Sequence, residues 1–244
     1  MPLPKIATPT YELELPSTEK TVNYRPFLVK EEKLLVLALE SEDTKQITTA
    51  IKAVLKSCVL TKGIKVEHLP TFDIENLFLH IRGKSVGEDI EVNITCPDDE
   101  KTQVPITLDL DDIKVQKNDK HNNQIKLDDN LMMELKYPSL DQFIKNNFDF
   151  DEKNQMEQSF DLIGTCIDKI YNEEEVWATA DCTKKEIKEF LESMNSSQFK
   201  EIENFFETMP KLSHTIKVTN PKTKVESEVV LEGLASFFGE AWHI

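Results

Sequence analysis

Few residues in this 244-residue chain have types and spacing that could support metal chemistry. Cys96 opens the stretch Cys-Pro-Asp-Asp-Glu, which resembles half of a zinc knuckle, but Asp99 stands where the second cysteine would be needed. Residues 109–120 are acidic like a calcium loop. Their sixth and twelfth positions are Lys114 and Lys120, where that loop needs glycine and a bidentate glutamate. The sequence therefore predicts no metal site.

Catalytic motifs are equally scarce. The chain has none of the patterns GxxxxGK[ST], GxGxxG, GxSxG or HExxH. Adjacent carboxylates such as Asp128-Asp129 and residues 173–175 occur because the chain is acidic, and no spacing selects two of them for acid–base catalysis. We therefore expect no catalytic residue and no cofactor. A hydrolase whose residues converge from distant elements is the least favoured alternative.

The charge of the chain limits its partners. The net charge is −16, of which residues 1–95 carry −2 and residues 96–244 carry −14. A polyanion gains nothing from counterion release on DNA or RNA, and anionic lipid repels it. The longest apolar run is six residues, whereas a membrane span needs about twenty. We expect neither nucleic acid nor membrane as a partner. The acidity favours solubility, or recognition of a basic partner.

Cysteine usage and the first residues indicate the compartment. The four cysteines are far apart in sequence and form no CxxC pair. The opening residues, MPLPKIATPT, do not form a signal peptide. These features predict reduced thiols in a cytoplasmic compartment.

Periodicity predicts an α+β fold in which short antiparallel hairpins are interleaved with helices. Alternating apolar residues predict hairpins over 11–24, 90–110 and 214–234, and Pro105 predicts an edge strand because it cannot donate to a ladder. Spacing of three and four residues predicts further helices. The expected helices are 29–40, one that ends at Cys58, 72–85, 139–148 and 152–171, followed by a C-terminal helical hairpin over 183–209. Their expected N-terminal caps are an Asp43–Gln46 pair for the helix that ends at Cys58, Thr71 for 72–85, and a Thr183–Glu186 capping box for the helical hairpin.

Composition divides the chain into three regions. Residues 1–115 hold the first two hairpins and three helices, residues 116–130 form a polar loop, and residues 131–244 form a mostly helical acidic region with the last hairpin. One continuous domain is the alternative.

The stretch from Thr21 to Asp43 carries the most specific pattern. Arg25-Pro26 interrupts a hairpin, because Pro26 cannot continue a ladder and favours an extended Arg25. Six apolar residues, 34–39, then cover every face of nearly two helical turns, whereas a surface helix usually spares its outer face. Either this helix is surrounded by its own fold, or its outer face meets another protein. We favour the core.

Two segments carry a family resemblance. The run PKIATPTYELELPSTEKTVNYRPFLVKEEKLLVLALES and the C-terminal LSHTIKVTNPKTK…VVLEGLASFF resemble baseplate hub proteins of T-even-like contractile-tailed bacteriophages. The resemblance implies a non-enzymatic hub subunit or hub assembly factor that binds other hub and tail proteins. Such a protein is made in the cytoplasm of the infected bacterium, and either stays in the virion baseplate or leaves after assembly. The residues expected at the partner interface are Arg25, Phe27, Leu28, Leu35 and Leu39.

A second class of function stays open beside this one. An acidic DNA mimic or inhibitor of host defence would use residues 96–244 as a carboxylate surface. Binding that weakens strongly with salt favours this alternative, and salt-insensitive binding favours apolar hub contacts. The sequence does not fix the oligomeric state.

Overall fold

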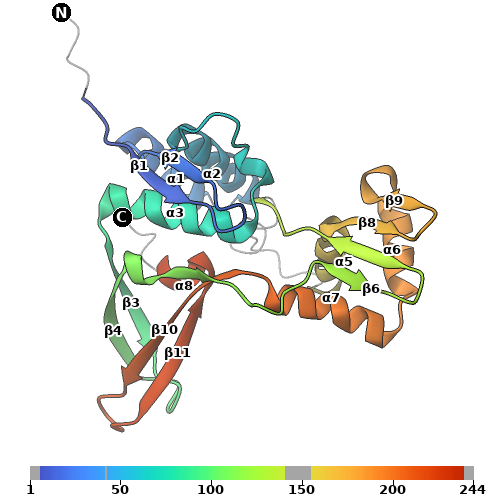
Figure 1. Ribbon diagram of the computed structural model, residues 1–244. Coiled ribbons are helices and arrows are strands. Elements are labelled where there is room, and N and C mark those ends of the chain that lie inside the picture. The colour runs from blue at the N-terminus through green and yellow to red at the C-terminus, as the bar shows by residue number, and fades with distance from the viewer. Residues whose placement is uncertain (1–5, 42, 141–154, 239–244) are drawn as a thin grey trace, which may run out of the picture.

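The computed structural model describes residues 6–41, 43–140 and 155–238, and it has the mixed α+β class predicted from the sequence (Figure 1). The elements fall into a larger and a smaller part. The larger part contains β1 (Tyr11–Glu14), β2 (Thr21–Tyr24), α1 (Val29–Glu40), α2 (Thr44–Cys58), α3 (Thr71–Val86), β3 (Asp89–Thr95), β4 (Gln103–Asp109), β5 (Lys114–Gln116), β10 (Lys211–Thr219), β11 (Glu226–Glu232) and α8 (Gly233–Phe238). The smaller part contains β6 (Gln124–Lys126), β7 (Met132–Leu135), α5 (Gln155–Cys166), β8 (Ile167–Tyr171), β9 (Val176–Ala178), α6 (Lys184–Glu192) and α7 (Ser196–Thr208).

The first hairpin packs on the helices as its alternation predicts. Strands β1 and β2 pair antiparallel from Tyr11↔Tyr24 onward, and they bury Val22 and Tyr24. The backbone N–H of Arg25 donates to the carbonyl of Cys58 over 2.9 Å, which fixes the end of β2 against the end of α2.

Helix α3 begins differently from the expectation. Its N-cap residue is Pro70 rather than Thr71, and no side chain caps it. Asp73, fully buried in the first turn, instead accepts from the backbone N–H of Ser17 over 3.0 Å and from the Ser17 hydroxyl. Burial raises the pKa of Asp73, and the two Ser17 bonds oppose that rise. The first hairpin is thereby joined to α3.

The other two predicted hairpins, β3–β4 and β10–β11, pack below the helices in Figure 1. Strands β3 and β4 form a two-stranded sheet, so Pro105 lies on an edge as expected. The turns of the two hairpins are joined through Asp98. Its carboxylate accepts from the Asn220 side-chain amide over 3.0 Å and from the Thr223 hydroxyl. The turn that resembles half of a zinc knuckle is therefore held by a hairpin whose contacting residues lie 122 and 125 positions further along the sequence.

The smaller part is inserted between two neighbouring strands of the larger part. The first three residues of β10 pair with β5, beginning at Lys211↔Gln116, and β10 pairs with β11 on its other side from Ser213 onward. The last hairpin, which sequence order groups with residues 131–244, therefore packs in the core of the larger part. The segment 116–130, expected as loop, contains strand β6. The three-region division itself stays a prediction.

In the smaller part, one predicted helix is longer than the helix in the structure. The helix expected over 152–171 ends at Cys166, and Ile167–Tyr171 forms β8 between β7 and β9. Ile167 and Ile170 are three residues apart, which fits a helix rather than a regular strand. They nevertheless pair with Leu135 and Met133 on β7, because the register of the β7–β8 pairing shifts between Glu134 and Leu135. Residues 152–154, like most of the helix expected over 139–148, lie outside the described residues.

The helical hairpin expected over 183–209 is not confirmed as a packed pair. The Thr183–Glu186 capping box is present at the start of α6, and Asn195 caps α7. Helix α6, however, packs against α5. The two helices approach closely at Gly164 of α5, where a Cβ would lie 3.1 Å from the Ile187 side chain of α6.

Aromatic rings join the two parts. Phe72 of α3 meets Tyr137 edge-on at 5.0 Å between ring centroids. Tyr137 stacks on His121 at 5.5 Å, and His121 lies 5.1 Å from Phe205 of α7. His121 Nδ1 lies 3.0 Å from the hydroxyl of Thr208, and burial lowers the pKa of His121, so the ring stays neutral at neutral pH.

Candidate partner-binding surface

Arg25 occupies the break between β2 and α1, where the sequence places the start of the partner site. Its guanidinium forms a two-pronged ion pair with Glu31, with Nη2–Oε1 at 2.6 Å and Nη1–Oε2 at 3.0 Å. It also donates to the hydroxyl of Ser57 at the end of α2 over 2.6 Å. A planar guanidinium fits a carboxylate in this way, which makes the pair stronger than a single bond. Arg25 therefore fastens β2 to two helices.

Glu31 is the other half of this network, and sequence reasoning did not identify it. Only 5% of the residue is exposed, and its carboxylate also accepts from the Ser57 hydroxyl and from the Leu28 backbone N–H, at 2.6 and 2.7 Å. The Arg25 hydrogen bonds, followed by those of Ser57 and Leu28, lower the pKa of Glu31 to about 2, against the opposing effect of burial. The spacing Leu28-x-x-Glu31 is the only local signal, since it places a glutamate where it can cap the first turn.

Phe27 and Leu28 lie side by side in sequence and differ in exposure. Phe27 is buried, and its backbone N–H donates to the hydroxyl of Ser85 on α3 over 3.0 Å. The side chain of Leu28 is exposed to solvent. Phe27 therefore anchors the start of α1, and Leu28 is the first residue of an exposed apolar surface.

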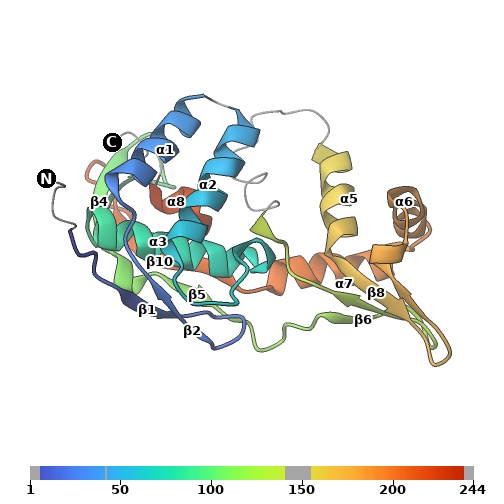
Figure 2. The ribbon, with the colours of Figure 1, turned by 90° about the horizontal axis from the view of Figure 1, so that it is seen from above.

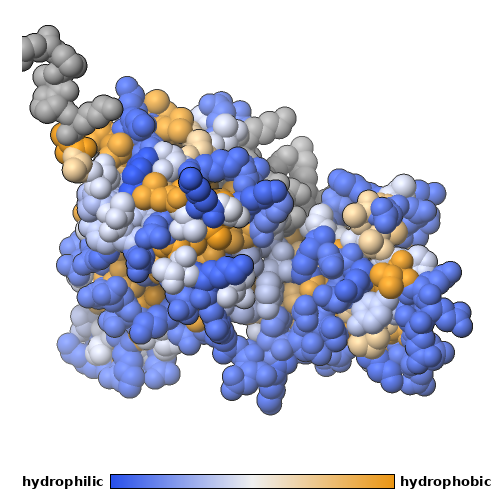
Figure 3. Space-filling view, turned by 45° about the horizontal axis from the view of Figure 1, so that its top comes forward, coloured by the Kyte–Doolittle hydropathy of each residue, from blue (hydrophilic) through white to orange (hydrophobic). Residues whose placement is uncertain are grey.

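Helix α1 is apolar on both its inner and its outer side. Leu35 and Ala38 face the core and are each 6% exposed. On the outer side, Val29 is 79% exposed and Leu37 is 54% exposed, with Leu34 beside them. We call Leu28, Val29, Leu34 and Leu37 the α1 apolar face. Figure 2 shows α1 at the outside of the helical layer, and Figure 3 shows hydrophobic patches among hydrophilic side chains over the larger part.

The five expected interface residues therefore separate into groups. Arg25, Phe27 and Leu35 make internal contacts, and Leu28 belongs to the α1 apolar face. The side chain of Leu39 lies outside the described ones. That these residues bind a partner stays a prediction. The exposed Leu34 and Leu37 were missed because the run 34–39 covers every face of a helix, and no periodicity shows which side is buried. Val29, which lies outside that run, was not singled out.

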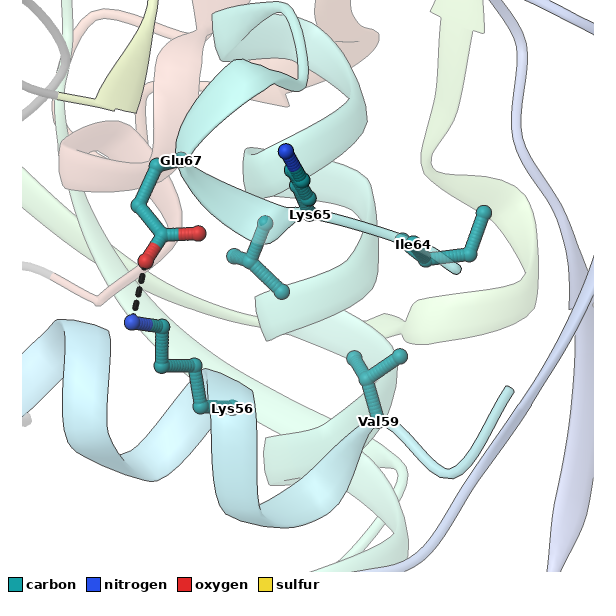
Figure 4. Close-up of a pocket in the computed structure, with 6 residues that line it drawn as sticks. Lys56, Val59, Ile64, Lys65 and Glu67 are labelled. Carbon is teal, nitrogen blue, oxygen red and sulfur yellow. Dashed lines mark ion pairs between the residues drawn. The ribbon is translucent and has the colours of Figure 1, made fainter. Parts of the chain in front are cut away.

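The described residues contain no group of three or more His, Cys, Asp or Glu side chains that could hold a metal ion. One pocket of about 330 Å³ lies between the end of α2 and the segment before α3. Figure 4 shows Lys56 and Glu67 forming an ion pair at its mouth, with Val59, Ile64 and Lys65 around it. A single carboxylate, whose pKa is lowered by Lys56, lines it. The pocket lining does not contain the pair of carboxylates that glycoside hydrolysis uses.

A comparison with protein families gives a match over nearly the whole chain. The model described as T4 bacteriophage base plate protein matches residues 8–239. The chain belongs to this family. Neither the search of curated proteins nor the search of solved structures finds a match.

Membership in the T4 base plate family gives the chain a structural or assembly role in a phage baseplate, which agrees with the resemblance of both end segments. It implies contact with other phage tail or baseplate proteins and a place in the virion. The family suggests a structural role rather than catalysis. Among the helices of the described residues, none has the length and apolar character needed to cross a membrane.

Proposed function

We propose that this base plate family member is a non-enzymatic hub subunit or hub assembly factor that binds a hub protein through the α1 apolar face. The observation that carries the proposal is the exposure of four large apolar side chains along α1 and at the residue just before it. Exposed apolar groups gathered on a folded protein mark interaction sites. A hydrophobic groove on a partner recognises a helix through residues three positions apart, such as Leu34 and Leu37.

The Arg25–Glu31 network supports this role by holding the start of α1. It joins the end of β2, the first turn of α1 and the end of α2 by charged hydrogen bonds of 2.6–3.0 Å. A surface held rigidly in its binding conformation loses less conformational entropy on association. Residues expected at the interface from sequence, Arg25 and Phe27, would then act by positioning Leu28 and Val29.

The test is affinity capture of this chain co-expressed with each tail and baseplate protein of its own phage. We expect the double variant Leu34→Ser/Leu37→Ser to weaken capture of a hub protein at least about tenfold, because exposed leucines fill the partner groove. Its melting should match the wild type, since both side chains are exposed. Val230→Ser removes an equally exposed apolar side chain from β11 and serves as the matched control.

The salt dependence of binding separates this proposal from a DNA mimic. Apolar contacts at α1 should persist when the salt concentration is raised several-fold. Recovery of basic host proteins that elute with salt, with capture unchanged in the leucine variant, would contradict the hub proposal.

A further inference from the structure

A second apolar surface lies in the smaller part, on the β8–β9 hairpin. In the sheet β6-β7-β8-β9, strand register places Met132, Tyr171 and Val176 in one row across three strands. The next row, Met133, Ile170 and Trp177, lies on the opposite face, because successive residues of a strand point to opposite sides.

The two rows differ in how the protein covers them. Met133 is fully buried and Ile170 packs against the core of the smaller part, but Trp177, at the edge strand, is 40% exposed. The other row faces away from that core, where alternation leads us to expect polar side chains, and it ends at Val176 with 65% exposure. The edge of the sheet therefore presents apolar groups on both faces.

Acidic side chains surround this edge. The turn before β9 consists of Glu173, Glu174 and Glu175, all exposed, and among the described residues no cation pairs with their carboxylates. The wider segment 155–208 carries 13 acidic and five basic side chains. Its net charge of −8 is half of the charge of the chain in less than a quarter of its length. A basic surface is attracted to this region, and an acidic or neutral one is not.

We infer that the β8–β9 hairpin is a second docking site, which inserts Trp177 and Val176 into an apolar recess lined by lysine or arginine side chains on another baseplate or tail protein. Tryptophan in such a recess supplies a large share of binding energy, and a charged rim sets the partner and the association rate. The hairpin and α1 lie at opposite ends of the molecule (Figure 1, Figure 2). The chain can therefore bridge two proteins. This inference rests on the proposed function.

The experiment measures binding of purified wild-type chain to the tail and baseplate proteins of its phage, each expressed separately. For one of these proteins, we expect Trp177→Ala and Val176→Ser to weaken binding at least about tenfold. The triple variant Glu173→Gln/Glu174→Gln/Glu175→Gln should weaken it as well and reduce its salt dependence. The α1 variant Leu34→Ser/Leu37→Ser should leave this partner bound.

Two controls separate the effects of lost charge and of lost stability from the effect on the binding site. Glu201→Gln/Glu203→Gln/Glu207→Gln removes the same charge from exposed positions of α7 and should leave binding nearly unchanged. Val176→Ser tests the site even if Trp177→Ala lowers the melting temperature, because Val176 is the more exposed.

The outcomes distinguish the two proposals. If proteins are captured but every hairpin variant binds them as the wild type does, the docking site is wrong and the hub role stands. If the triple variant on α7 weakens binding as much as the one on the hairpin, the contact is diffuse charge attraction and the hairpin site is wrong. If the wild type captures no tail or baseplate protein, the proposed function fails, and this inference fails with it.

Discussion

Replacing Leu35 with aspartate is expected to unfold the larger part of the protein, whereas the same replacement at Leu37 leaves its melting unchanged. Leu35 is 6% exposed in the main core, so Leu35→Asp loses the leucine packing and buries a carboxylate without a partner. The first effect alone costs about 2–5 kcal/mol and the second several more, which together approach the whole stability of a typical domain.

Circular dichroism at 222 nm during heating measures this difference. The helical signal of Leu35→Asp should be weak at all temperatures, or be lost at a temperature far below that of the wild type. The curve of Leu37→Asp should follow the wild-type curve, because the Leu37 side chain faces solvent. In the binding assay, Leu37→Asp should lose the hub partner although it remains folded. A wild-type melting curve for Leu35→Asp would show that the helix is not packed as described.

Removing Arg25 is expected to destabilise the protein by about 3–5 kcal/mol, because Glu31 then remains buried without its counter-charge. Urea denaturation of Arg25→Ala at neutral pH measures this as a lower midpoint with an unchanged slope. Asp129→Asn breaks the exposed Lys126–Asp129 pair and should leave the midpoint nearly unchanged. An equal effect of both variants would mean that the Arg25 network is no stronger than a surface pair.

The same network predicts a specific pH dependence. The pKa of Glu31 is lowered in the folded state to about 2, so the unfolded state binds the proton more tightly. Stability from this group is therefore fully present above the unfolded pKa and is lost as pH falls toward the folded pKa, between about pH 5 and pH 2. The difference in unfolding free energy between wild type and Glu31→Gln, about 3 kcal/mol at neutral pH, should shrink over that window. A difference that is constant with pH would contradict the lowered pKa.

Several elements could be predicted because their signals are local. The three hairpins follow from alternation, α2 from spacing of three and four residues, and the Thr183–Glu186 capping box from four consecutive positions. Each depends on contacts within a few residues of one another, which the printed sequence contains. At residues 167–171 the local spacing indicated a helix, and this was wrong because pairing with β7 and β9, with a register shift, made the segment a strand.

The candidate site remains a prediction, and its internal contacts could be foreseen from the sequence only in part. The sequence indicated the segment from Arg25 into α1, and the structure brings Arg25, Glu31 and Ser57 together there. It did not indicate that Arg25 is used internally, because its partner on α2 lies 32 residues away and no motif joins them. The β8–β9 hairpin was hidden for a different reason, because its second strand is only three residues long and shows little alternation.

The sequence by itself determined the acidic character of the chain, the mixed α+β class, the place of the main helices and hairpins, and the resemblance to phage baseplate proteins at both ends. Only the tertiary structure decided which side of α1 is exposed, that β10 pairs with β5 across the inserted smaller part, and that Trp177 stays uncovered. The physical reason is that periodicity gives the type of an element from its own residues. The burial of each face depends on which distant elements pack against it, and an apolar run that covers every face of a helix offers no preference of its own.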